Sequence, residues 1–250
     1  MKISDITEEK IDQGLDNAVE EFKKKFPDTI LYHGNRNNFI TGHFQKLTKF
    51  REKSKDTPNF INYLINQHLI EDFGVPVRNL MYLTENPNIA EGYGYVYIVI
   101  PKGNYRMFYA SGVDDFTVYI GYQDIMERIV RNVFDIYEYS DKEQYIIKKA
   151  IEINHSEYFR SFEKASNEKE MNDAIKYIEY ISEEKDLVYR FHENILEESH
   201  NYVENLYNDF YNVEEIKSSD DMPSDGEEIM AYFPNGFYLI NEGDIEDYFE

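Results

Sequence analysis

The pattern of hydrophobic and polar positions predicts both helices and short strands, in an irregular order along the chain. Near the N-terminus, apolar residues recur at the spacing of a helix that ends at Pro27. Thr29–His33 alternates like a short strand, which Gly34 and Asn35 end. The segment 39–50 is ambiguous, and we interpret it as a turn followed by a helix. A further helix opens at Pro58 and ends at Gly74.

The next part of the sequence has an extended pattern. β-branched and aromatic residues fill 95–100, and this run is the clearest strand signal in the chain. The other extended elements are shorter and are separated by turn residues, such as Pro234-Asn235-Gly236. We predict strands at 79–84, 105–109, 228–233 and 237–240, a short helix at 88–92, a loop at 112–115 and an acidic tail at 242–250.

Residues 123–213 contain no Gly or Pro, and their apolar residues recur at helical spacing. We predict three or four helices there, with turns near Ser140, Asn154 and Ser182. Their charged faces fit a solvated helical subdomain better than a lid or a target-recognition insert. The fold class is therefore α+β, in a single domain of residues 1–250 with 123–213 as a helical insertion.

Composition narrows the function classes. The formal net charge is -23, from 26 basic and 49 acidic residues, which repels phosphate backbones at long range and fits a basic protein partner better. There is no Cys, so disulfides and thiolate chemistry are excluded. No apolar run has membrane-spanning length and the N-terminus does not look like a signal peptide, so we expect a cytoplasmic protein without membrane contact.

Three segments combine short extended runs with residues that can do chemistry. Leu31–Arg36 carries His33, Met81–Tyr93 carries two tyrosines, and Glu227–Ile240 begins with two glutamates. The other histidines lack the spacing of a metal pair, and we expect no metal site. The sequence contains neither a phosphate-binding P-loop nor a dinucleotide fingerprint.

Taken in order, these segments resemble the ADP-ribosyltransferase superfamily, in particular its His-Tyr-Glu branch, which includes the poly(ADP-ribose) polymerases and diphtheria-type toxins. His33-Gly34-Asn35-Arg36 is similar to the family's first motif, with Asn35 in place of a hydroxyl residue. Tyr82 and Tyr93 match the second motif, and Glu228 matches the third. Glu227 resembles the paired glutamates of the arginine-directed branch. The resemblance covers the strands on either side of the helical insertion, and implies a split antiparallel β-core with a cleft for NAD.

The resemblance also implies roles for these residues. Glu228 would accept a hydrogen bond from the 2′-hydroxyl of the nicotinamide ribose and stabilise the positive charge that builds there. His33 would bind the adenosine ribose, and Gly34 would offer backbone groups to the carboxamide. Tyr82 and Tyr93 would stack on the nicotinamide ring. Each residue also fits an ordinary structural role, such as packing for the tyrosines or an exposed strand end for the glutamate.

Arg36 would bind the pyrophosphate of NAD through charge-assisted hydrogen bonds. A surface ion pair is an equally good interpretation of this residue. With Glu228, His33 and Tyr82 as the catalytic set, the resemblance implies a mono-ADP-ribosyltransferase that releases nicotinamide from NAD. Its acceptor is a protein or a nucleic acid, and family analogy favours a toxin or a phage–host conflict factor with an inhibitor or antitoxin partner. Two alternatives stay open. One is a catalytically inactive member of the fold that acts as a binding or inhibitor protein. The other is an NAD-dependent RNA 2′-phosphotransferase-like enzyme, with Arg36 and Arg78 as its extra cations.

Overall fold

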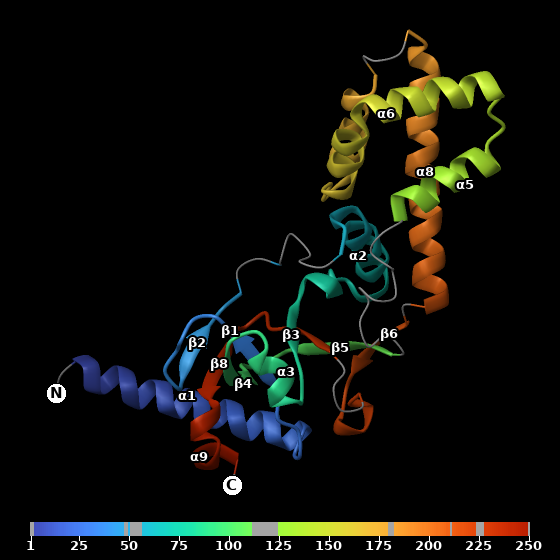
Figure 1. Cartoon of the computed structure of the whole chain (residues 1–250). Helices are drawn as coiled ribbons and strands as arrows, with labels where there is room; N and C mark the ends of the chain where they lie inside the picture. The colour runs from blue at the N-terminus through green and yellow to red at the C-terminus, as the bar shows by residue number, and fades with distance from the viewer. Residues whose placement is uncertain are drawn as a thin grey trace. The chain divides into compact units, whose positions relative to one another are not determined.

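The computed structural model describes residues 3–47, 50, 57–111, 125–179, 183–210, 212–223 and 228–249. Its backbone contacts divide the chain into two compact units. The sheet unit comprises Met1–Phe50, Leu80–Asp114 and Val213–Glu250, and the helical unit comprises Arg51–Asn79 and Asp115–Asn212. Figure 1 labels the helices and strands of both units.

Two four-stranded antiparallel sheets form the centre of the sheet unit, so the chain belongs to the α+β class. The strands lie in the orders β1-β4-β8-β2 and β3-β7-β5-β6. Their bounds are β1 Tyr32–Asn35, β2 His43–Gln45, β3 Met81–Leu83, β4 Tyr95–Pro101, β5 Arg106–Ser111, β6 Asn212–Ile216, β7 Ile229–Tyr232 and β8 Phe237–Asn241. The helices of this unit are α1 Ile3–Lys25, α3 Pro87–Glu91 and α9 Glu246–Phe249, with short 3-10 turns at Ser219–Asp221 (η3) and Glu242–Asp244 (η4).

One hydrophobic cluster joins α1 to the first sheet. The face of α1 that carries Leu15, Val19 and Phe22 is buried, and these side chains belong to the same cluster as Ile98 and Leu239 of the central strands. Each buried Leu or Phe of this kind contributes about 1.5–3 kcal/mol relative to an exposed one. Packing of α1 therefore stabilises the first sheet.

The helical unit contains α2 Asn59–Phe73, η1 Val77–Asn79, α5 Ile125–Ile136, α6 Asp141–Glu163, α7 Glu168–Asp173, η2 Ala174–Tyr177 and α8 Lys185–Phe210. As the periodicity predicts, α2 buries Phe60, Leu64 and Leu69, and Gly74 ends it with a φ of 74°.

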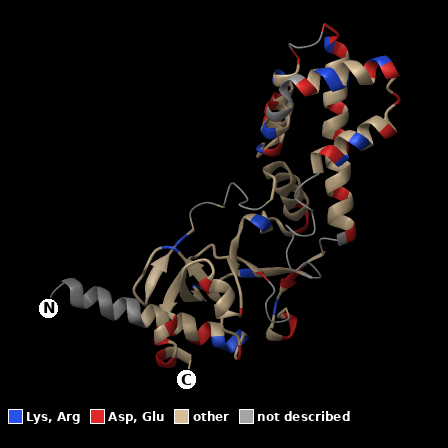
Figure 2. Cartoon of the chain, viewed as in Figure 1, with Lys and Arg blue, Asp and Glu red and all other residues tan. Residues whose placement is uncertain are grey.

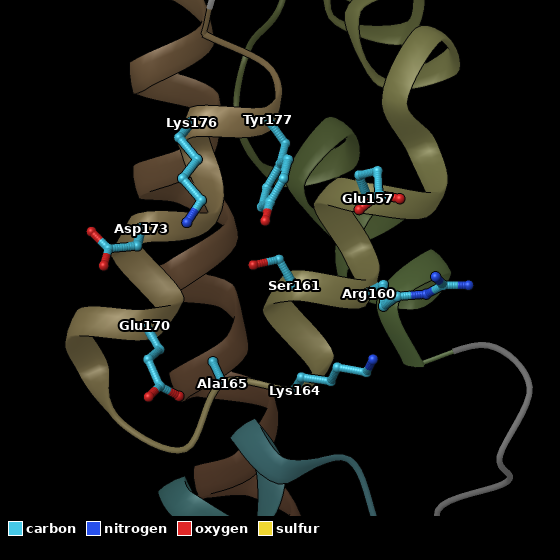
Figure 3. Close-up of a pocket in the computed structure, with 9 residues that line it drawn as sticks. All are labelled: Glu157, Arg160, Ser161, Lys164, Ala165, Glu170, Asp173, Lys176 and Tyr177. Carbon is cyan, nitrogen blue, oxygen red and sulfur yellow. The ribbon is translucent and has the colours of Figure 1, made fainter.

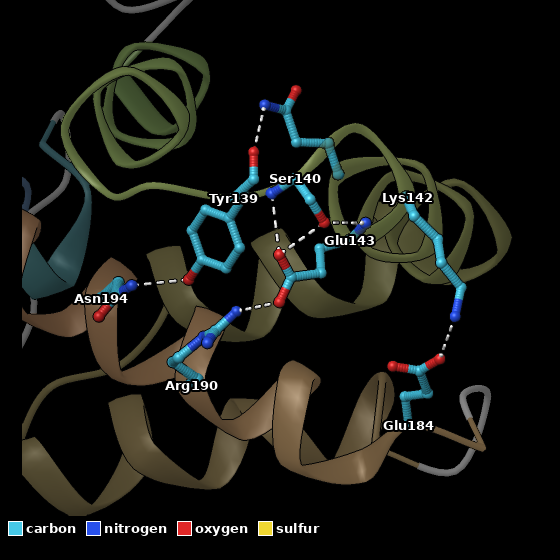
Figure 4. Close-up of polar contacts among 8 residues, drawn as sticks. Tyr139, Ser140, Lys142, Glu143, Glu184, Arg190 and Asn194 are labelled. Atoms are coloured by element: carbon cyan, nitrogen blue, oxygen red, sulfur yellow. Dashed lines mark hydrogen bonds and ion pairs between the residues drawn. The ribbon is translucent and has the colours of Figure 1, made fainter.

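Polar contacts fix the start of α6. Glu143 accepts hydrogen bonds from the backbone and hydroxyl of Ser140 and from Arg190 of α8 (Figure 4). These donors lower the pKa of Glu143 to about 2.

Four sequence predictions of local structure are corrected. Among the described residues of 39–50, the structure has β2 and no helix, because this segment pairs with β8 along the sheet edge. Strand β1 begins and ends later than predicted, since Gly34 and Asn35 still pair with β4. No turn occurs near Asn154, because the buried stripe of α6 continues from Ile147 to Phe162. The helix expected to reach residue 213 ends at Phe210, and the buried Val213 and Ile216 belong to β6.

Two predictions, the loop at 112–115 and the turn near Ser182, lie outside the described residues. The extent of the helical insertion, 123–213, stays a prediction, and the compact helical unit also takes in the segment that holds α2. Among the described residues, no helix combines the length and apolar character that crossing a membrane requires.

A buried histidine gives the helical unit a pH-dependent stability. His192 is 3 % exposed, and its Nδ1 shares a hydrogen bond of 3.0 Å with the Tyr158 hydroxyl. Burial lowers the pKa of His192 to about 4, although the backbone carbonyl of Asn172 opposes the shift.

His192 therefore stays neutral in the folded chain while it protonates near pH 6.5 in the unfolded chain. Its contribution to stability is complete above pH 6.5 and falls as the pH drops toward 4. We expect the free energy of unfolding to fall by about 2 kcal/mol more in wild type than in His192→Gln between about pH 7 and 5. Urea unfolding of both proteins at the two pH values measures this difference, and equal losses would contradict it.

Candidate active site

His33 lies on β1 of the sheet unit, opposite Tyr97 of β4. The side chain is half-buried, and Nδ1 lies 3.0 Å from the backbone carbonyl oxygen of Tyr82. A carbonyl can only accept, so Nδ1 carries the proton and donates it. Burial lowers the pKa of His33, with the bond to Tyr82 opposing, so the ring is neutral at pH 7 and Nε2 is an acceptor.

The two sheets meet beside this histidine. Tyr32 donates its backbone N–H to the Thr84 carbonyl at 2.7 Å, and Thr84 donates back to the Tyr32 carbonyl at 3.0 Å. This isolated bridge connects β1 of the first sheet to the chain that follows β3 of the second. The first two sequence motifs are thus in contact through backbone groups.

Glu228 is the residue before β7, and its burial class is exposed. In the antiparallel pair of β7 with β3, Ile229 lies opposite Leu83 and Met230 lies opposite Tyr82. Continuing this register by one residue sets Glu228 opposite Thr84. His33 and Tyr82 therefore lie on β1 and β3, and Glu228 lies one residue before the neighbouring strand β7. Glu227 lies outside the described residues.

Gly34 allows a close contact between β1 and α3. A Cβ atom at this position would lie 2.0 Å from the Ala90 carbonyl oxygen and 2.7 Å from the Tyr93 Cβ. Tyr93 follows α3 and is 55 % exposed, whereas Tyr82 is half-buried. The absence of a side chain at Gly34 is what brings Tyr93 against the strand that carries His33.

Arg36 is exposed in the loop that follows β1. That loop is held by Tyr97, a residue that the sequence analysis did not single out. The Tyr97 hydroxyl is 2.6 Å from the backbone nitrogen of Phe39, from which it accepts a hydrogen bond. It also lies 3.2 Å from the Asn37 carbonyl, to which it donates. Because a buried Tyr needs a partner for its hydroxyl, its place in an apolar strand was the signal for this role.

Other features of the described chain lie apart from these residues. No group of three or more His, Asp or Glu residues could hold a metal ion within the described residues. A pocket of about 340 Å³ lies in the helical unit between α6 and the α7–η2 segment. Its lining includes Ser161, Lys176 and Tyr177 and charged residues of both signs, but none of the predicted site residues (Figure 3).

Arg78 belongs to the helical unit and is 7 % exposed. Its guanidinium donates to the Asn62 side chain at 3.2 Å and to the Thr57 hydroxyl at 3.2 Å, and its backbone N–H donates to Asn66. These contacts give Arg78 a structural role in connecting α2 to η1.

A substitution of His33 tests its contact with a ligand. If NAD binds here as the resemblance implies, His33→Leu, which removes the acceptor Nε2 and the bond to Tyr82, should raise the Kd for NAD about tenfold. That factor corresponds to the loss of about one hydrogen bond. In wild type the affinity should also fall as the pH drops through the lowered pKa of His33, below 6.5, because protonation removes the acceptor.

Calorimetric titration of NAD from about pH 7.5 to 5 measures both effects. The acid-side loss should be absent in His33→Leu. His200→Leu, which removes an exposed histidine of the helical unit, is the matched control. Equal affinities in His33→Leu and wild type would show that His33 does not contact the ligand.

Comparisons of the chain with protein-family models, with curated proteins and with solved structures find no match.

Proposed function

We propose that this chain cleaves the nicotinamide bond of NAD and transfers a single ADP-ribose to a macromolecular acceptor. The observation that supports this most directly is the hydrogen bond from His33 Nδ1 to the Tyr82 carbonyl. The β3–β7 register and the Tyr32–Thr84 bridge bring the backbone of the three distant segments close together, which supports the proposal. Two four-stranded antiparallel sheets that meet at Tyr32 and Thr84 also fit the split β-core expected for an ADP-ribosyltransferase.

NAD supplies an activated bond between ribose and a good leaving group, and positive charge builds on the ribose as that bond breaks. The Glu228 carboxylate stabilises this charge and accepts from the ribose 2′-hydroxyl. The neutral His33 offers Nε2 as an acceptor for a hydroxyl of the other ribose. Tyr82 and Tyr93 present ring faces for stacking, and the exposed Arg36 meets the pyrophosphate.

The set fits NAD because the neutral histidine, the two accessible tyrosines and the exposed carboxylate lie on adjacent elements of one unit. The nicotinamide leaves with the electron pair of the broken bond, and the acceptor group forms the new bond to the ribose carbon and loses a proton. No cofactor or metal is needed to balance this transfer.

The two rival functions differ in what they require. A 2′-phosphotransferase needs further cations at the site, and the burial of the Arg78 guanidinium against Asn62 and Thr57 argues against its use there. A binding or inhibitor protein would need no intact carboxylate at position 228. The proposal makes that carboxylate essential.

The test is the release of free nicotinamide from NAD by the purified chain. We expect measurable release that depends on Glu228. Adding isotope-labelled NAD to a lysate, followed by nuclease or protease digestion, then identifies the class of acceptor. If no nicotinamide is released with or without the lysate, the proposal fails.

A further inference from the structure

A group of exposed apolar side chains lies beside β2 in the sheet unit, on the short segment 40–50. Ile40 is 81 % exposed, Leu47 45 %, Phe50 42 % and Phe44 39 %. Single exposed apolar residues are common on protein surfaces, but four within eleven residues are not explained by packing of the core.

Two cations lie at the same place. Lys46 is exposed and directly follows β2. The Lys102 ammonium lies 4.9 Å from the ring centre of Phe44 and 5.9 Å from that of Tyr238. Neither lysine has an ion-pair partner among the described residues. We call the surface formed by Ile40, Phe44, Lys46, Leu47, Phe50 and Lys102 the aromatic–basic surface.

The charge balance of the sequence around this surface is the opposite of that of the whole chain: it is basic, whereas the chain is acidic. About one residue in five of the chain is acidic, yet Thr29–Arg51 contains no Asp or Glu and four Lys or Arg. Figure 2 shows acidic residues spread over the helices, whereas the strands β2 and β8 carry none. Asp244, which accepts from Thr41, is a carboxylate at the margin of the surface.

Screening by salt determines whether a ligand above β2 is affected by the net charge of the whole chain or by the nearby lysines. At physiological ionic strength the field of an exposed charge is screened beyond about 8 Å. The local lysines, rather than the net charge of -23, therefore set the potential above β2.

The aromatic–basic surface and the candidate active site belong to the same compact unit. In the first sheet, β2 is separated from β1 by β8 and β4. Three strand spacings amount to about 14 Å. The strand register places Phe44 on the face of this sheet that carries Tyr32, and His33 on the opposite face. The connection to the candidate site therefore runs through Phe50. Its ring lies 5.7 Å from that of Tyr232, which ends β7, and alternation along an extended chain puts residues 228 and 232 on the same face.

We propose that the aromatic–basic surface binds single-stranded nucleic acid, and that this nucleic acid is the acceptor of ADP-ribose; the second part depends on the proposed function. Exposed rings beside lysines are the combination that single strands need, because bases stack on the rings and phosphates meet the ammonium groups. A protein partner of an acidic chain would be expected to be basic, and it would be repelled by this surface. A nucleophilic nitrogen or oxygen of a base or sugar forms the bond to the ribose carbon and loses its proton, and nicotinamide leaves with the electrons of the broken bond.

The test measures binding of a fluorescent single strand of about 12 nucleotides, RNA or DNA, to the full chain without NAD. We expect Phe44→Ala with Phe50→Ala to weaken binding at least about tenfold through lost stacking. Lys46→Gln with Lys102→Gln should remove most of the salt dependence, which for two phosphate contacts is about a sevenfold loss of affinity between roughly 50 and 200 mM salt.

The matched control is Lys142→Gln with Lys169→Gln, which removes the same charge from exposed positions of the helical unit and should leave binding unchanged. Circular dichroism checks that each variant is folded. Absence of binding at the lower salt, equal affinity in all variants, or preference for anionic lipid vesicles or an acidic peptide over nucleic acid would overturn the proposal.

Because NAD is absent from this assay, its outcome is separate from that of the proposed function. Nucleic-acid binding without nicotinamide release would leave the surface assignment standing and remove the acceptor role. Nicotinamide release without nucleic-acid binding would remove the surface assignment and leave the proposed function standing.

Discussion

Replacing Glu228 with Gln is expected to lower the rate of nicotinamide release by about 10²–10³-fold, the effect of removing one preorganised electrostatic contact to a transition state. Gln has nearly the same size and can still accept a hydrogen bond, so the substitution removes the negative charge with little change in packing. Because that charge acts on the developing positive charge, the loss should appear in kcat rather than in KM.

The matched control is Glu246→Gln, which removes an exposed carboxylate of α9 in the same unit. It should keep the wild-type rate, since it changes the net charge equally but lies outside the proposed catalytic set. A Glu228→Gln protein as active as this control would exclude the catalytic role and favour the binding-protein alternative.

The second large effect is expected at Gly34. An Ala side chain there would come within 2.0 Å of a backbone oxygen of α3, and backbone cannot turn aside as a flexible side chain can. We expect Gly34→Ala to destabilise the sheet unit by about 3 kcal/mol, at the upper end of the cost of overpacking. It should also weaken NAD binding, because β1 and Tyr93 must separate. Thermal unfolding and NAD titration measure the two losses.

Gly92→Ala is the control for this effect. Gly92 follows the same helix with helical φ and ψ of -57° and -18°, and a Cβ there would meet only the Ile89 carbonyl oxygen at 3.3 Å. Its stability should stay within about 1 kcal/mol of wild type. If both variants were equally stable, the contact between β1 and α3 would not be the constraint that it is taken to be.

The strongly patterned elements could be predicted from the sequence. The strand at 95–100 and the helix after Pro58 appear where their periodicity indicates, because burial of their apolar faces agrees with local propensity. β2 could not be predicted, since its three residues gain their conformation from pairing with β8, far along the chain. Asn154 was a misleading turn signal, because the buried stripe of α6 outweighs one polar residue.

For the candidate site, the sequence suggests a set of residues but not their arrangement. The order of the three motifs is the basis for proposing His33, Tyr82 and Glu228, while the register that makes their strands neighbours depends on long-range pairing. A tyrosine in an apolar strand signals that the Tyr97 hydroxyl needs a partner, but the sequence does not say that the partner is the loop after β1. The backbone contacts of Thr84 leave no such signal. The aromatic–basic surface was missed for a different reason, since a net charge of -23 conceals a stretch that has no carboxylate.

The most direct test of the account is the position of NAD in a crystal of the Glu228→Gln protein, in which slow cleavage should leave the dinucleotide intact. We predict the nicotinamide ring beside Tyr82 and Tyr93, with a ribose hydroxyl on His33 Nε2 and the adjacent ribose facing residue 228. NAD bound in the pocket of the helical unit, or bound without contact to His33, would contradict the account.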